Sequence, residues 1–218
     1  MKRIYIVVEG QTEQEFVRSV MAHYFFTKGV VSVTPILIRT SKTGRGGHVS
    51  AKHLLKTIAG LLATVKNDVL VTTFVDFFRI PNNMPDFEQS MSLPNDTLRV
   101  KSLEDALARK VNDPRFIPYI QLHEFEALLF SNNKGFEDYF SEEQSAQTAE
   151  IISAFANPED INSSLETAPS KRILALERGY DKVLQGNLIA MDVGMDDMLA
   201  KCPRFSLWVS HLIEFSAN

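Results

Sequence analysis

The sequence predicts an α/β fold, with a mostly parallel four-stranded sheet flanked by helices and a C-terminal all-helical extension. Two apolar runs carry this prediction: Ile4–Val8 stops abruptly at Glu9, and Val69–Val75 stops at Asp76. Continuous Ile/Val runs without polar alternation are typical of strands that are covered on both faces. Amphipathic helical patterns separate the runs, which is the order expected of a parallel sheet with right-handed crossovers.

The predicted strands are Arg3–Val8, Val31–Ile38, Val69–Val75 and Phe116–Leu122. We expect helices to begin near Thr12, at Ser50 and near Leu98, and a short helical turn over Ala127–Phe130. Thr12 is expected to cap the first helix with Glu15 as its capping-box partner. The Pro/Asn-rich segment Arg79–Asn95 is predicted to be irregular, because it is dense in turn-forming residues.

The chain is divided here into an α/β domain over residues 1–130 and a helical subdomain over residues 131–218 that packs on it. The helices expected in the second part are Gln144–Phe155, Ser170–Glu177, Met195–Lys201 and Ser206–Phe215. Prolines between these segments separate them, since proline removes a backbone donor and interrupts a helix.

Composition limits the function classes. The 218 residues are 44% apolar and 23% charged, as in an ordinary globular protein. A formal net charge of −4 argues against a broadly basic nucleic-acid-binding surface, although a local basic patch is compatible with it. Because Cys202 is the single cysteine, an intrachain disulfide is excluded. No apolar stretch has membrane-spanning length, so we expect a cytoplasmic protein without membrane contact.

Acidic residues follow the predicted strands where each strand ends. Glu9, Asp76, Glu124 and Glu126 would all lie at the carboxyl edge of a parallel sheet, the edge where open α/β sheets bind ligands. Carboxylate oxygens suit Mg²⁺ or Mn²⁺, and converging carboxylates repel one another without a cation. The alternative interpretation is that each acid simply caps a helix N-terminus. We favour a metal site, with Glu124, nearest its strand end, as the safer third ligand.

Glycines and basic residues suggest where phosphate groups would bind. The loop Thr40–His48 contains Arg45, Gly46 and Gly47 ahead of a helix, and helix N-termini with exposed backbone amides favour anions. Its alternative interpretation is a flexible surface loop. Further basic residues that could contact phosphates are Lys52, Lys171 and Arg172, whose alternative role is ordinary solvated surface.

Seven segments together resemble a known family. They are VVEGQTEQEFV, GGHVS, TTFVDFFRIP, DPRFIPYIQLHEFEALLF, TAPSKRI, YDKVLQG and KCPRFSLW. They resemble a widespread prokaryotic family of unknown function, number 4276 among such domains, and the resemblance runs from Ile6 to Trp208. The HEFEALLF block is the most specific part, whereas the VEGxTE block is shared with several Toprim-related families.

The resemblance implies a relation to Toprim domains, the metal-binding α/β module of primases, topoisomerases and OLD-type nucleases. Glu9 matches the Glu that follows the first strand of that module, and Asp76 matches the first Asp of its Asp-x-Asp motif. Phe78 stands at the second Asp position, which removes one expected ligand. Members are often encoded beside ABC/SMC-type ATPases, so the resemblance also implies a partner ATPase and a role in defence or DNA repair.

The leading hypothesis is a Mg²⁺-dependent phosphoryl-transfer enzyme, most simply a nuclease acting on nucleic acid. Glu9 would act as general base or ligand, Asp76 would hold the metal, and Glu124 or Glu126 would complete the catalytic set. The first alternative is a non-catalytic Toprim-like module that binds a partner ATPase, a nucleotide or nucleic acid. A second alternative is an enzyme acting on a small phosphate compound through the glycine-rich loop. The oligomeric state is left open.

Overall fold

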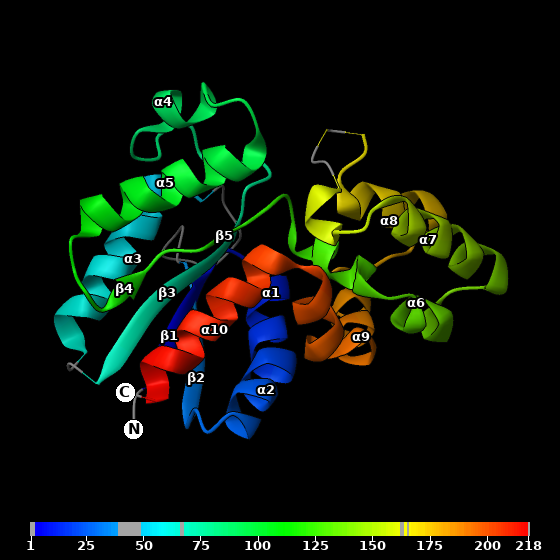
Figure 1. The fold of residues 1–218 in the computed structure, drawn as a ribbon, viewed down its shortest axis with the longest axis horizontal. Helices are drawn as coiled ribbons and strands as arrows, with labels where there is room; N and C mark the ends of the chain where they lie inside the picture. Colours follow the sequence, from blue (N-terminus) through cyan, green and yellow to red (C-terminus); the bar gives the residue numbers. More distant parts are fainter. Residues whose placement is uncertain (1–2, 39–48, 66–67, 162–163, 165, 218) are drawn as a thin grey trace.

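Parallel strands form the centre of the molecule, as predicted. The computed structural model describes residues 3–38, 49–65, 68–161, 164 and 166–217, and within them it forms one five-stranded sheet (Figure 1). The strands are β1 (Arg3–Val8), β2 (Ser32–Leu37), β3 (Val69–Asp76), β4 (Phe116–Ile117) and β5 (Ile120–Gln121). Their order is β2-β1-β3-β4, β5 also pairs with β3, and every pairing is parallel.

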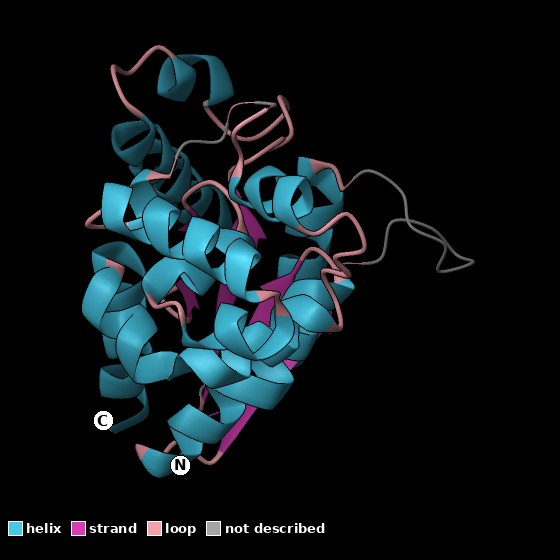
Figure 2. Ribbon diagram, turned by 90° about the vertical axis from the view of Figure 1, so that its right-hand side faces the viewer, coloured by secondary structure: helices cyan, strands magenta, loops and turns pink. Residues whose placement is uncertain are grey.

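Helices surround the sheet and make up the C-terminal region (Figures 1 and 2). They are α1 (Gln11–Phe16), α2 (Ala22–Thr27), α3 (Ala51–Thr64), α4 (Phe87–Met91), α5 (Asp96–Val111), α6 (Lys134–Tyr139), α7 (Glu142–Ala154), α8 (Pro169–Leu176), α9 (Gln185–Lys201) and α10 (Pro203–Ala217). A π-helical segment, Val17–Met21, joins α1 to α2, and 3₁₀ segments span Phe125–Ser131 and Pro158–Asp160. In the described part of the chain, none of these helices combines the length and apolarity needed to cross a bilayer.

Both faces of the central strands are buried, which explains their uninterrupted apolar sequences. On one face, Ile6 and Phe74 pack in a core that includes Phe205 and Trp208 of α10. The opposite face forms a second core beneath α3 and α5. Figure 1 shows α3 and α5 on one side of the sheet and α1, α2 and α10 on the other. Because the C-terminal helices supply part of the first core, they pack directly on the sheet.

The fourth predicted strand, Phe116–Leu122, is not continuous. It forms two short pairings, β4 and β5, separated by Pro118 and Tyr119. Proline has no backbone N–H, so the ladder is interrupted there. The Thr73 hydroxyl replaces the missing backbone pairing: its Oγ1 donates to the Tyr119 carbonyl over 2.7 Å and accepts from the Tyr119 N–H over 2.8 Å. A polar residue inside the apolar β3 run thus connects the two halves of the edge strand.

The first helix begins earlier than predicted, and Thr12 does not cap it. Gly10 is its N-cap residue, and the backbone N–H of Gly10 donates to Oε2 of Glu13 over 2.9 Å. The capping carboxylate is therefore Glu13 and not Glu15. Thr12 is buried in the first turn. The difference matters for function, because it turns Glu13 toward the end of β1.

Two further predictions about elements were incomplete. The segment Arg79–Asn95 was expected to be irregular, yet it contains α4. The helix expected over Met195–Lys201 begins ten residues earlier, at Gln185, with a break at Gly194, whose φ of 77° suits glycine. Helix α6 was not predicted, since it is short and lacks a strong apolar period. The other C-terminal helices agree with the prediction to within a few residues.

Replacing Thr73 by valine tests the bridged edge strand. The substitution keeps the side-chain shape but leaves the buried Tyr119 N–H without its acceptor. We expect the free energy of unfolding in urea to fall by about 1–3 kcal/mol. Thr64→Val is the matched control, because the exposed Thr64 hydroxyl bonds only its own helix, and we expect a change within about 0.5 kcal/mol. Equal effects of the two substitutions would contradict this role of Thr73.

Candidate functional site

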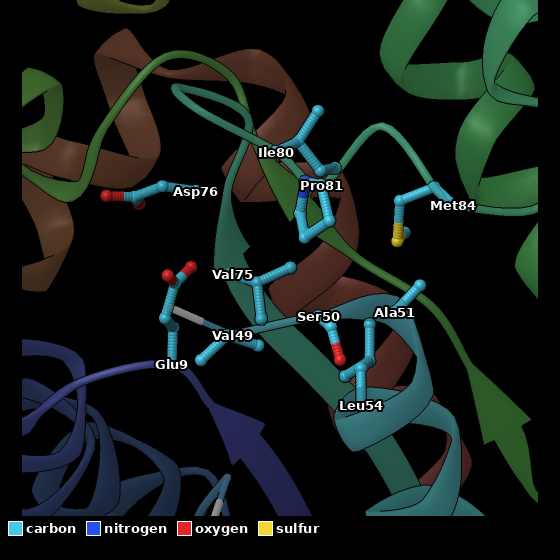
Figure 3. A pocket seen from close by; sticks show the side chains of 10 residues that line it. All are labelled: Glu9, Val49, Ser50, Ala51, Leu54, Val75, Asp76, Ile80, Pro81 and Met84. Carbon is cyan, nitrogen blue, oxygen red and sulfur yellow. The ribbon is translucent and has the colours of Figure 1, made fainter. Parts of the chain in front are cut away.

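The carboxylates of Glu9 and Asp76 lie together at the carboxyl edge of the sheet. β1 and β3 are adjacent and in register, with Val8 opposite Phe74, so the residues that follow them emerge at the same edge. Both acids line a small pocket with about 260 Å³ of empty space, whose other walls come from α3 and the segment after β3. Figure 3 shows both carboxylates on the same side of this pocket, apart from the apolar side chains of Leu54 and Met84. The pairing of strands that the sequence predicted thus brings these two acids to one site.

Asp76 is the centre of a larger acidic cluster, defined here as Glu9, Glu13, Asp76, Glu124 and Glu126. Oδ1 of Asp76 accepts a hydrogen bond from the backbone N–H of Phe125 over 3.0 Å. Burial raises the pKa of Asp76 well above its usual range, and the charges of the other four carboxylates raise it further. Glu9 is the exposed member of the cluster, and desolvation also raises its pKa.

Glu13 is a member that sequence reasoning missed. It lies in the first turn of α1, four residues after Glu9, and its side chain is 8% exposed. Burial raises the pKa of Glu13, with a smaller contribution from Glu9, against the lowering effect of its backbone hydrogen bonds. A signal was present, since an acid at the third helical position often turns back to the N-cap. That signal was assigned to Glu15 instead.

Glu124 is already engaged by groups of the C-terminal region. Its Oε1 accepts from the Ser170 hydroxyl over 3.0 Å, and its Oε2 accepts from the Ser170 backbone N–H over 3.0 Å. Ser170 lies in the first turn of α8, where a carboxylate is favourable because the helix N-terminus carries unpaired N–H groups. His123, just before Glu124, has φ of 68°, so the chain turns sharply at the end of the strand. Glu124 is thus an N-terminal cap as well as a cluster member.

Lys182 supplies the cation that faces this cluster. Its Nζ lies 2.8 Å from Oε1 of Glu126 and 3.6 Å from Oε1 of Glu124. Burial lowers the pKa of Lys182, but the two glutamates outweigh it and leave that pKa raised. Glu126 is only 1% exposed, and burial raises its pKa despite Lys182. The structure therefore places Lys182 against two acids of the cluster.

Tyr180 lies near Glu126 and Glu124 and packs closely against Gly186. The Tyr180 hydroxyl is buried and has no hydrogen-bond partner among the described residues. A Cβ at Gly186 would lie 2.6 Å from this hydroxyl, so the close packing requires glycine. Burial raises the pKa of Tyr180 well above its usual range, and the nearby Glu126 and Glu124 add to the shift. The phenol is therefore a protonated donor beside the cluster.

The residues predicted to contact phosphate have different outcomes. Arg45, Gly46 and Gly47 lie outside the described residues. Lys52 is exposed in the first turn of α3, next to pocket-lining Ser50 and Ala51. Lys171 is exposed in α8.

Two other basic residues of the helical part are occupied within the fold. The guanidinium of Arg172 donates to the Thr167 carbonyl and lies 5.3 Å from the ring centroid of Phe155. Arg204 pairs with Glu104 at 2.8 Å. Each guanidinium is thus partly engaged within the fold, and phosphate contact by Arg172 stays a prediction.

The donor set fits a hard cation only in part. Among the residues that the structure describes, no group of three or more His, Cys, Asp and Glu side chains has an arrangement that could hold a metal ion. Glu124 and Glu126 face Ser170 and Lys182, as described above. The pair formed by Glu9 and Asp76 borders the open pocket. Two carboxylates are within the number that proteins use for Mg²⁺, which keeps several waters and often binds substrate phosphate.

Cys202 is expected to be chemically inert. Its thiol is buried, 3.5 Å from the Ser131 hydroxyl, and burial raises its pKa to about 12. Because the thiolate is the reactive form, native protein at about pH 8 should not react with a colorimetric disulfide reagent within minutes. Protein unfolded in guanidinium should react with one equivalent. Rapid labelling of the folded protein would show that the thiol is accessible.

The acidic cluster should make the protein less stable as the pH rises. A raised carboxyl pKa means that the folded state holds a proton more tightly than the unfolded state, whose carboxyl pKa is about 4. The contribution of Asp76 to stability is therefore greatest at low pH and is lost as the pH rises through its folded pKa. Asp76→Asn keeps the acceptor for the Phe125 N–H and removes the charge, so it should stabilise the protein at about pH 8 and have little effect near pH 4.

The measurement is the free energy of unfolding of wild type and Asp76→Asn across this range. His123, whose pKa is lowered by burial, contributes an opposite slope, but it does so in both proteins and cancels in the difference. Asp105→Asn, in an exposed pair with Lys101, is the control. A loss of stability in Asp76→Asn at high pH would contradict the repulsion argument.

Comparisons with known proteins agree with the sequence resemblance at the level of the family. Neither the curated proteins nor the solved structures contain a match to this chain. One family model matches residues 8–213, which include every described member of the acidic cluster. The chain therefore belongs to the family described as domain of unknown function DUF4276.

Proposed function

We propose that this protein is a Toprim-like, divalent-cation-dependent enzyme of phosphoryl transfer on nucleic acid, most simply a nuclease. The observation that carries the proposal is the meeting of Glu9 and Asp76 at the ends of adjacent parallel strands, beside an open pocket. In an open parallel sheet this edge is where ligands bind. A role in DNA repair or defence beside a partner ATPase follows from the resemblance alone.

The repulsion among the carboxylates supports cation binding at the same site. Five carboxylates influence one another around Asp76, and Lys182 is the cation that faces them. Lys182 lies against Glu126 and Glu124, so the repulsion that remains falls on Glu9, Glu13 and Asp76. A divalent cation would relieve this repulsion better than a proton can near neutral pH. We therefore place Mg²⁺ or Mn²⁺ at Glu9 and Asp76, and assign Glu124 and Glu126 supporting roles.

Each residue of the candidate site would have a separate role in phosphoryl transfer. A bound Mg²⁺ or Mn²⁺ supplies Lewis acidity toward a phosphate and lowers the pKa of water. Glu9, exposed and with a raised pKa, would help to hold the cation or, as the alternative role, would accept a proton from an attacking water. Asp76 is held in position by the Phe125 N–H. Lys52, beside the pocket, is the nearest described basic residue on α3 that could contact a substrate phosphate.

A non-catalytic binding module is the second candidate, and Phe78 favours it. Phe78 stands where the Toprim pattern has its second Asp, and the guanidinium of Arg79 lies 5.1 Å from its ring centroid. A cation–π contact occupies the position where a ligand would be expected. Both carboxylate oxygens of Glu124 accept hydrogen bonds from Ser170, so Glu124 is less available as a metal ligand. Under this proposal the site would bind a nucleotide, a nucleic-acid end or a partner ATPase without cleaving.

Cation binding and cleavage are measured separately to decide between the two. Titration calorimetry with Mn²⁺ tests binding, and incubation with plasmid or single-stranded DNA in Mg²⁺ or Mn²⁺ tests cleavage. The nuclease proposal expects Asp76→Asn and Glu9→Gln each to lower cleavage by at least about 100-fold, since each removes a group needed at the reacting phosphate. The exposed Asp105→Asn should cleave as wild type does.

The results of the binding and cleavage measurements distinguish the two candidate functions. Mn²⁺ binding that is lost in Asp76→Asn, without cleavage of any DNA, favours the binding module. Cleavage that survives both site substitutions rejects these residues. Absence of Mn²⁺ binding in folded wild-type protein rejects the cation site itself.

A further inference from the structure

A long groove runs between the first helical segment and α9, and its lining residues include no member of the acidic cluster. One part is lined by residues of α1, the π-helical segment, α9 and the turn before it, among them Glu15, Ser19, Leu184 and Met191, and has about 690 Å³ of open space. The adjoining part, about 1170 Å³, shares Ser19 and Met191 with it and continues along α2 and past Gly194. Figure 1 shows α9 beside α1. We call the two parts together the α1–α9 groove.

An apolar stripe forms one wall of the groove. Leu184, Leu188 and Met191 follow one another at i, i+4 and i+7, which places them on one side of a helix. Leu184 is 63% exposed and Met191 is 54% exposed, so this side is not covered by the protein itself. The solvent side of a helix normally carries polar residues. A regular apolar stripe beside a second helix is typical of a groove that binds another helix.

Charge identifies the kind of segment that would occupy it. The described residues that line the groove include five carboxylates, Glu15, Asp181, Asp192, Asp196 and Asp197, and two lysines, Lys28 and Lys134, with His23 also present. The acids lie at both ends of the apolar stripe, with Glu15 and Asp181 in one part of the groove and the other three in the adjoining part. An apolar stripe with acidic ends is complementary to a helix that carries basic residues around an apolar seam.

The buried amide of Asn187 adds a polar feature to the same wall. Its Nδ2 donates to the Thr12 carbonyl over 3.2 Å and to the Val183 carbonyl over 2.9 Å, which fixes the orientation of the amide. Its Oδ1 has no partner among the described residues, although the side chain is only 4% exposed. A buried acceptor without a donor is unfavourable. This unpaired acceptor lies just beneath the exposed apolar stripe, between Leu184 and Met191 in the sequence.

We infer that the α1–α9 groove binds a basic amphipathic helix of another protein, with apolar residues of that helix on Leu184, Leu188 and Met191. A second copy of this chain is a poor occupant. The protein has a net charge of −4, and a two-fold contact through this face would bring the same five carboxylates together. The inference does not depend on cation binding or on cleavage.

The test uses a fluorescent helical peptide of about 18 residues, five turns, with leucine at i, i+4 and i+7 positions and lysine on the rest of its surface. A second peptide carries glutamate in place of lysine. Fluorescence anisotropy at low salt should show saturable binding of the lysine peptide and none of the glutamate peptide. Leu184→Lys and Met191→Lys should each weaken binding by at least about tenfold, the scale expected of an apolar anchor.

Leu207→Lys is the matched control, because Leu207 is 59% exposed on α10, outside the residues that line the groove. It should bind the lysine peptide as wild type does. Circular dichroism confirms that each variant is folded before it is compared. The proposal is overturned if the lysine peptide does not saturate, if the glutamate peptide binds equally well, or if Leu184→Lys and Leu207→Lys behave alike. Sedimentation that shows a wild-type dimer converted to monomer by Leu184→Lys would also overturn it, by making the second copy the occupant.

Discussion

Repulsion between carboxylates at the carboxyl edge of the sheet is the constraint to which much of this structure responds. Adjacent parallel strands bring Glu9 and Asp76 to one place, and α1 adds Glu13. Burial strengthens the repulsion, because fewer waters screen the charges. Backbone N–H groups stabilise two of these carboxylates: Gly10 donates to Glu13, and Phe125 donates to Asp76. Each response fixes a loop at the sheet edge, so the charged groups also organise the backbone around them.

The C-terminal helices complete this arrangement from the other side. They supply Lys182 opposite Glu126, and the first turn of α8 opposite Glu124. The same region places Trp208 against β3, where its indole N–H donates to the Thr72 hydroxyl over 2.9 Å. A buried hydrogen bond and an ion pair therefore both hold the helical region against the rest of the chain. Glu126 is buried whereas Lys182 is partly exposed, so removing Lys182 would leave a buried carboxylate without its partner and would lower the stability of the chain.

Sequence reasoning was sufficient where local pattern determines structure. The apolar runs predicted β1 and β3, and parallel order then predicted that Glu9 and Asp76 meet. Sequence reasoning failed where the structure of a segment depends on a residue far from it in the sequence. Thr73 bridges the interrupted edge strand, and nothing near Pro118 in the sequence indicates that partner. Lys182 lies more than fifty residues from Glu126, so their pairing follows only from tertiary packing. Glu13 could have been found, because its capping position is a local signal.

The two halves of the acidic cluster have different chemistry, and that difference bears on Phe78. Glu124 accepts hydrogen bonds from Ser170 and Glu126 pairs with Lys182, whereas Glu9 and Asp76 border the pocket. A carboxylate at position 78, two residues after Asp76, would have added a further negative charge at this edge of the sheet, where Glu9 and Glu13 already raise the pKa of Asp76. With phenylalanine there, two carboxylates, Glu9 and Asp76, border the pocket. Under the proposal above, this number suits one Mg²⁺ with waters and phosphate rather than a two-metal centre. The departure from the Toprim pattern is thus consistent with the charge that this edge of the sheet can bear.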